Sequence, residues 1–117
     1  MKPALKGKGD AYREQIVSMR RHLHQFPEVS GEEHATSKTV QEKLGEHGIS
    51  FTAGYAETGV LGVVEGGRPG KTVALRADMD ALPIQEENEH SFVSKVDGVM
   101  HACGHDAHTA MLVGASG

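Results

Sequence analysis

What the sequence lacks limits the classes of protein that it can encode. It has a single cysteine, Cys103, so an internal disulfide framework is excluded, and a lone thiol suits a reducing compartment. No run of about 18 apolar residues occurs, which argues against a transmembrane helix. The formal net charge is -4 with the histidines neutral, which argues against nucleic acid or a membrane as the main partner. We therefore expect a cytoplasmic protein.

Aromatic residues are also scarce, with no Trp, two Tyr and three Phe, so the core must be built from aliphatic side chains and Met. A chain of 117 residues is long enough for one domain with a core of its own. The first ten residues are polar and contain glycine, without the apolar segment of a signal peptide. We expect them to be frayed.

The first regular element that the pattern predicts is a helix over residues 11–26. Apolar residues repeat there at three- and four-residue spacing from Ile16 to Phe26, which places them on one face. Asp10 is the predicted N-cap. Pro27 ends the helix, because the residue before a proline is pushed out of the α region.

A second helix is expected to begin at Ser30. Ser30 and Glu33 have the spacing of a capping box. At the other end, Gly48 suits the left-handed position after a helix, and Ile49 can then contact Leu44. The charged residues of this helix, Glu33 included, are interpreted as a solvated face.

Three strands are predicted next, over residues 51–55, 60–65 and 72–78. The short loop between the last two predicts antiparallel pairing, and the apolar run in residues 72–75 predicts a strand covered on both faces. A buried helix is predicted over residues 107–114. The sequence thus indicates an α/β fold, with two helices, then a mixed β-sheet, then a buried helix.

Two groups of polar residues are interpreted without a special role. Residues 82–99 have the composition of a surface loop, and within it residues 85–87 are expected to be solvated. His22 and His24, near the end of the first helix, are expected on its surface or beside its C-terminal dipole. An active-site role for either histidine is the alternative.

The chemistry of the chain is concentrated in residues 100–109, which read Met-His-Ala-Cys-Gly-His-Asp-Ala-His-Thr. Thiolate and imidazole are common ligands of transition metals. Cys103 and His105 are two positions apart, so an extended backbone would aim both at one point, and the glycine between them permits an unusual conformation. We predict that these two residues are metal ligands and leave the roles of His101 and His108 open.

A second polar group closes the predicted strand over residues 72–78. Arg76, Asp78 and Asp80 alternate, so they share one side if the chain stays extended. One interpretation is an Arg–Asp pair that ends the strand. The other is a carboxylate that orients a metal ligand.

Four segments together resemble a known family. Residues 20–28, 57–60, 74–86 and 100–109 occur in the order found in M20-family metal-dependent amidohydrolases, and the resemblance extends from about residue 11 to the end of the chain. The branch that the chain resembles is that of the hippurate, N-acyl-L-amino-acid and IAA-amino-acid hydrolases.

The resemblance implies a site with two divalent metal ions, drawn from zinc, manganese, nickel and cobalt. Cys103 and His105 would be ligands, with Cys103 bridging the ions, and Asp78 would be the catalytic carboxylate that orients a ligand. Related enzymes place a cis peptide after the bridging ligand, which would be the Cys103–Gly104 bond.

The resemblance also implies what the protein does. Members of the family are longer, so residues 1–117 would be a partial catalytic domain, without the lid and dimerisation domain or the C-terminal half of the catalytic domain. The full-length parent, a homo-oligomer, would hydrolyse the amide bond of small N-acyl amino acids, as an aminoacylase or carboxypeptidase does. The isolated chain is expected to be inactive and to self-associate.

Two other functions are compatible with the same residues. Cys103 could be the nucleophile of a thiol hydrolase, with a nearby histidine as its base. The histidine-rich segment could also belong to a metal-binding module that has no catalytic activity.

Overall fold

The structure, a computed structural model, describes the backbone of residues 3–117 and the side chains from residue 6 onwards. The elements are α1 (Pro3–Gln25), α2 (His34–Glu46), β1 (Ser50–Tyr55), β2 (Gly59–Val63) and α3 (His105–Ala115). The predicted α/β class, with two helices, then strands, then a helix, is confirmed.

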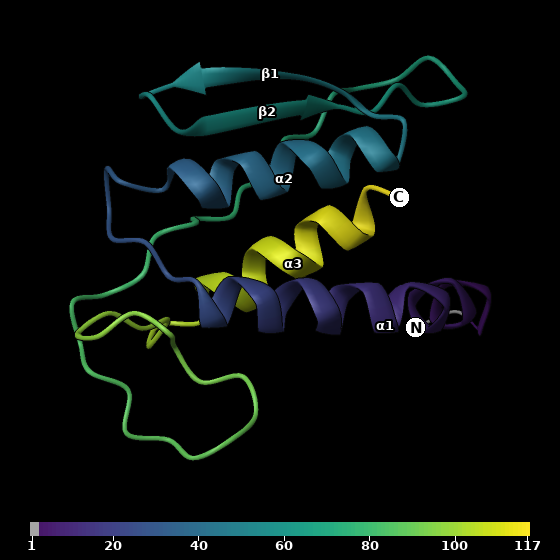
Figure 1. The fold of residues 1–117 in the computed structure, drawn as a ribbon. Helices are drawn as coiled ribbons and strands as arrows, with labels where there is room; N and C mark the ends of the chain where they lie inside the picture. The colour runs from purple at the N-terminus through teal and green to yellow at the C-terminus, as the bar shows by residue number, and fades with distance from the viewer. Residues whose placement is uncertain (1–2) are drawn as a thin grey trace.

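The elements form layers around one small core. In Figure 1 the β1–β2 hairpin covers one side of α2, and α3 lies between α2 and α1. Each helix contributes two buried apolar side chains where the three helices meet. These are Met19, Leu23, Val40, Leu44, Ala110 and Val113. Burial of such side chains is worth roughly 1.5–3 kcal/mol each for the larger ones, so this cluster holds the three helices together.

Helix α1 is longer than predicted. It begins at Pro3, so the fraying expected of residues 1–10 is wrong for residues 3–10, and residues 1 and 2 lie outside the described part of the chain. Asp10 lies inside the helix rather than at its N-cap. Proline is tolerated in the first turn of a helix, where its missing N–H is not needed. The predicted end is confirmed to within one residue, since Gln25 is the last residue of the helix.

Helix α2 does not begin with the predicted capping box. Its first residue is His34, and Ser30 lies in a turn before it. The carboxylate of Glu28 takes the capping role, because its Oε1 accepts hydrogen bonds from the backbone N–H and the hydroxyl of Thr36, each at 2.6 Å. Its Oε2 accepts from the N–H of Ala35 at 3.1 Å. A carboxylate from outside the helix therefore satisfies the free donors of the first turn.

The side chain of Glu33 also departs from the prediction. It is buried rather than solvated, and it accepts a hydrogen bond from the hydroxyl of Thr58 at 2.8 Å. The end of α2 is as predicted. Gly48 has a φ of +70°, and the N–H of Ile49 donates to the carbonyl of Leu44 at 2.9 Å. This is the closing bond that the sequence pattern implied.

Two of the three predicted strands are present. Strands β1 and β2 pair antiparallel, with Ser50 opposite Val63. The predicted strand over residues 72–78 is not found, and its Val73 and Leu75 side chains are 79% and 73% exposed. Within the described residues the sheet is therefore a two-stranded antiparallel hairpin, not a mixed sheet. An apolar run alone does not make a strand, because a strand also needs a neighbour with which to pair.

The loop predicted over residues 82–99 is confirmed, and two isolated bridges hold its ends. Ala81 bridges to Val29 just after α1, and Leu82 bridges to Met100 just before the histidine-rich segment. These bridges fix the chain at residues 78–82 beside the start of α3. No helix within residues 3–117 combines the length and the apolar character needed to cross a membrane.

Helix α3 confirms the helix predicted over residues 107–114 and extends it by two residues at the start and one at the end. It is buried on one face only, because Ala110 and Val113 lie in the core whereas Met111 is 51% exposed. The side chain of Ile16 on α1 lies so close to Gly114 that a Cβ there would overlap it. A residue without a side chain thus lets α1 and α3 approach each other closely.

Candidate metal centre

Cys103 and His105 lie on either side of Gly104, the residue just before α3, and His105 is the first residue of the helix. Gly104 is the N-cap of the helix and has a φ of +94°, a left-handed conformation that glycine adopts without strain. The prediction of an unusual backbone at this glycine is confirmed. The expected cis peptide after Cys103 is wrong, because no peptide bond among the described residues is cis.

The imidazole of His105 is held by Asp80. Its Nδ1 lies 3.0 Å from the Asp80 carboxylate Oδ1 and 3.0 Å from the Asp80 backbone oxygen. Both oxygens are acceptors, so Nδ1 carries the proton and donates it to them. In the neutral ring the lone pair is then on Nε2. A carboxylate that fixes the tautomer of a histidine in this way is the usual partner of a metal-ligating imidazole.

Asp78, the predicted orienting carboxylate, has a different neighbour. Its Oδ1 lies 2.6 Å from Nη2 of Arg76, in an exposed ion pair, so the interpretation as an Arg–Asp pair describes the observed contact. The backbone oxygen of Asp78 accepts a hydrogen bond from Thr109 of α3 at 2.8 Å, which keeps this segment against the helix. A catalytic role for Asp78 stays a prediction.

Asp80, which contacts His105, was not distinguished from Asp78 by the sequence. The alternation of Arg76, Asp78 and Asp80 placed all three on one side, but nothing in that spacing ranks the two carboxylates. The ranking comes from the bridges at residues 81 and 82, which bring Asp80 to the start of α3.

The remaining members of the histidine-rich segment differ in their surroundings. Cys103 is a free, exposed cysteine, so its sulfur is accessible from solvent. His108 is exposed, and its ring centre lies 6.1 Å from that of His105. His101 is buried, and burial is the main cause that lowers its pKa below the ordinary value of 6.5. His101 is thus neutral at pH 7.

Behind this segment lies a buried polar network that the sequence did not reveal. His24 is 3% exposed, which corrects the prediction that it lies on the helix surface. Its Nδ1 lies 2.7 Å from Oδ2 of Asp106, and Nε of Arg20 donates to the same oxygen at 2.9 Å. Its Nε2 lies 2.9 Å from Oε2 of Glu86. Partners 62 and 82 positions apart leave no local pattern in a sequence.

Glu86 was predicted to be solvated, but its side chain is only 2% exposed. Burial raises the pKa of this carboxyl group. Hydrogen bonds from His24, from Asn88 and from the Ser94 amide outweigh the effect of burial and lower the pKa from 4.5 to about 2. Glu86 is therefore an ionised carboxylate near neutral pH.

The described residues form open grooves on the surface, and the two that bear on the site differ in position. One of about 710 Å³ runs between α1, α2 and α3, and it is lined by mostly helical surface residues such as Glu14, His22 and Lys43. The other, of about 490 Å³, is lined by Asp78 and Asp80 among others. The smaller groove is the one that reaches the carboxylate beside His105, so we place the candidate site on that side of the molecule.

Comparison with known proteins gives consistent matches. The model of peptidase family M20/M25/M40 matches residues 74–116. Thermostable carboxypeptidase 1 of Saccharolobus solfataricus is 53% identical over 102 residues, which are 86% of this chain and 26% of that protein. The N-acyl-L-amino acid amidohydrolase of Geobacillus stearothermophilus is 50% identical over 107 residues, which are 92% of this chain and 29% of that protein.

A solved structure agrees with these relatives. The YXEP protein of Bacillus subtilis, described as a dinuclear metal binding peptidase from the M20 family, superimposes with a TM-score of 0.84 at 45% identity. The match covers 89% of this chain and 29% of that one. The chain thus spans between a quarter and a third of the length of the relatives that it matches.

Proposed function

Because this chain belongs to the M20/M25/M40 peptidase family, we propose that its protein is a metal-dependent amidohydrolase that cleaves the amide bond of small N-acyl amino acids. The names of two relatives, an N-acyl-L-amino acid amidohydrolase and a carboxypeptidase, support this reaction class. Within the chain, the observation that carries the proposal is the hydrogen bond between His105 and Asp80 at 3.0 Å. It prepares Nε2 of His105 for a metal ion.

The residues present fit one part of a two-metal centre. Cys103 offers an accessible sulfur, and His105 offers a nitrogen whose tautomer is fixed by Asp80. We propose that these two residues would hold divalent ions of a two-metal site, of zinc, manganese, nickel or cobalt; the bridging role of Cys103 is what the family resemblance implies. Such ions, when bound, polarise an amide carbonyl and lower the pKa of a bound water.

The chain's own residues then have positioning roles. Asp80 holds the ring of His105, and Thr109 holds the backbone of residue 78 against α3 at 2.8 Å. The exposed carboxylate of Asp78, proposed from the family resemblance, lies at the edge of the same groove. These contacts keep the start of α3 and the segment before residue 82 in one arrangement while substrate binds.

Two ligands seldom bind a divalent ion tightly, because catalytic sites normally have three protein ligands. We propose that residues 1–117 form the first part of the catalytic domain. The general base, the remaining ligands and a lid that mediates homo-oligomer formation would lie elsewhere in the protein. This division agrees with a chain that spans 26% and 29% of two relatives. We propose a cytoplasmic location, because a metal-binding thiol has to stay reduced.

The test is a panel of N-acyl amino acids offered to the complete enzyme before and after treatment with a chelator. We expect hydrolysis that is lost on chelation and restored by one of the four metals. Cys103→Ala should reduce the restored activity by a factor of about a hundred or more, as expected when a metal ligand is removed. Hydrolysis that persists after complete removal of metal would refute the proposal.

The exposed apolar residues support a further expectation about association. Val63, Val64, Val73 and Leu75 are between 55% and 79% exposed. Exposed apolar side chains and open strand edges invite pairing with other chains. We expect the 117-residue chain alone to self-associate, and a concentration series in light scattering that gives the mass of one chain throughout would contradict this.

A further inference from the structure

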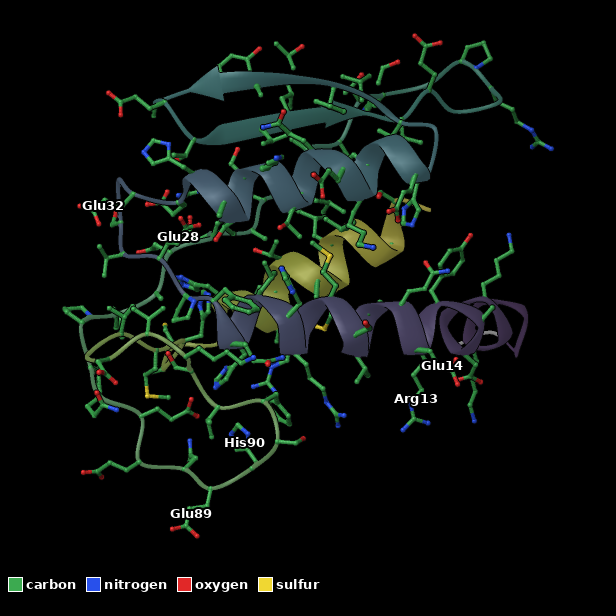
Figure 2. All side chains as sticks on the ribbon, in the orientation of Figure 1. Arg13, Glu14, Glu28, Glu32, Glu89 and His90 are labelled. Carbon is green, nitrogen blue, oxygen red and sulfur yellow. The ribbon has the colours of Figure 1, made fainter. Side chains whose placement is uncertain are left out.

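The polar network behind the histidine-rich segment contains a group of side chains suited to a metal ion. His24, near the end of α1, and Glu86 and His90, in the loop after residue 82, place one ligand atom each within 4.8 Å of the others. Nε2 of His24 lies 2.9 Å from Oε2 of Glu86, and Nε2 of His90 lies 3.2 Å from the same oxygen. Figure 2 labels His90 on the loop that runs alongside α1.

The two ring nitrogens of His24 make the strongest argument. Nδ1 lies 2.7 Å from a carboxylate oxygen of Asp106, and Nε2 lies 2.9 Å from one of Glu86. An ionised carboxylate only accepts hydrogen bonds, whereas a neutral imidazole has one donor and one acceptor. With both carboxyl groups ionised, both contacts are favourable in only two cases. Either the ring carries two protons, or a cation occupies the place of the proton between Nε2 and Glu86.

Asp106 is placed as the orienting carboxylate of such a site. Its side chain is buried, and Nε of Arg20 donates to the same Oδ2 at 2.9 Å. Arg20 thereby fixes the carboxylate that accepts the Nδ1 proton of His24, so a metal ion that replaced the Nε2 proton would meet the Nε2 lone pair beside Glu86 and His90. A carboxylate–histidine–metal arrangement of this kind raises the basicity of the ligand and sets the direction of the ring.

The ligand types and their accessibility match a divalent metal. Two imidazoles and one carboxylate form a three-residue ligand set found in zinc sites. His24 and Glu86 are almost fully buried, whereas the side chain of His90 is 29% exposed, which leaves a route from solvent. The ring of Phe92 lies 4.0 Å from that of His90 and 5.7 Å from that of His24, centre to centre, and limits how far either can turn.

We propose that His24, Glu86 and His90 form a further binding site for a divalent transition metal of the zinc class, separate from the centre at Cys103 and His105. Two of the ligands come from the loop and the third from α1. A bound ion would therefore tie the loop to the helix and stabilise the folded chain by mass action. The chemistry of this site does not involve sulfur, which distinguishes it from the other centre.

The experiment is a titration of the 117-residue chain carrying Cys103→Ser with cobalt(II), followed by competition with zinc(II). Without the thiol, the other centre has no thiolate-to-cobalt charge-transfer band. The remaining ligand-field absorption then reports cobalt bound by nitrogen and oxygen ligands. We expect one ion per chain, and a rise in the melting temperature with zinc. Adding His90→Ala should weaken binding at least about tenfold and remove that rise.

The matched control is His34→Ala in the same Cys103→Ser background, because His34 is exposed on α2 and outside the group. This variant should bind as tightly as its parent. Far-UV circular dichroism checks that each variant folds. If His90→Ala fails to fold, NMR of the Cys103→Ser chain tests the site instead. It measures whether zinc shifts the ring signals of His24 and His90.

Each result decides for or against the site. Loss of affinity in the His90 variant with retention in the His34 variant supports it, and so do zinc-induced shifts of both rings. Absence of binding in the Cys103→Ser chain overturns the proposal, and so does equal affinity in the two histidine variants. The latter outcomes would assign His24, Glu86 and His90 to an ion-pair network only. Activity of the complete enzyme is not used, so failure here leaves the proposed hydrolase function standing.

Discussion

Glu28, which follows α1, caps α2 through Thr36, whose N–H and hydroxyl both donate to the same carboxylate oxygen at 2.6 Å. Glu28→Ala should destabilise the chain by about 1–2 kcal/mol, as expected for loss of an N-terminal cap. Urea unfolding measures the change. Glu32→Ala is the control, because Glu32 is exposed four positions away, at the outer edge of the turn before α2 (Figure 2). Equal losses in the two variants would show that Glu28 is not the cap.

The approach of α1 to α3 at Gly114 gives a second prediction. A Cβ at this position would overlap the side chain of Ile16, so Gly114→Ala should destabilise the chain by about 1–3 kcal/mol through overpacking. Gly45→Ala in α2 is the matched control. A Cβ at Gly45 meets nothing within 4 Å, and alanine favours a helix over glycine by about 1 kcal/mol. Thermal unfolding should therefore move in opposite directions for the two variants, and a stabilised Gly114→Ala protein would contradict the packing described.

The sequence predicted best the features that depend on neighbouring residues. The end of α1 before Pro27, the left-handed Gly48 and the unusual backbone at Gly104 were all predictable, because each follows from the conformational limits of one residue. The continuous apolar run from Ala110 to Val113 also identified α3 to within two residues.

The features that the sequence did not predict depend on contacts between distant segments. The cap of α2 comes from Glu28, outside the spacing of a capping box, because the turn at residues 30 and 31 brings the start of the helix back to that carboxylate. Glu86 and His24 looked like surface residues, since nothing local shows that a carboxylate and an imidazole 62 positions apart will be buried together. The same reason explains why Asp80, rather than Asp78, contacts His105.

Glu86 makes the free energy of unfolding of the metal-free chain depend on pH in the acid range. Its pKa is about 2 in the folded chain and near 4.5 when unfolded, so the folded state favours the ionised form. The contribution is present above pH 4.5 and is lost as the pH falls from about 5 to about 2. It amounts at most to roughly 3 kcal/mol, from 1.36 kcal/mol per pKa unit. Glu86→Gln should lack this contribution.

The measurement is urea unfolding of both proteins between pH 7 and pH 2.5 with a chelator present. Other carboxylates titrate in both chains, so the informative quantity is the difference in unfolding free energy between them. We expect this difference to be largest near neutrality and to shrink as the pH falls. A difference that stays constant over the whole range would show that the hydrogen bonds from His24 and Ser94 do not favour the ionised carboxylate.

Asp80 and Asp78 offer a direct comparison of two carboxylates two positions apart. Asp80 contacts Nδ1 of His105, whereas Asp78 pairs with Arg76 in solvent. Asp80→Asn removes the negative charge that makes Nε2 of His105 a stronger ligand. The affinity for cobalt at Cys103 should therefore fall about tenfold or more. The thiolate-to-cobalt absorption band measures this affinity. Asp78→Asn disrupts only an exposed ion pair, worth about 0–1 kcal/mol, and should change that binding little. The reverse order of effects would assign the orienting role to Asp78, as the family resemblance implied, and would require the segment at residues 78–80 to shift when metal binds.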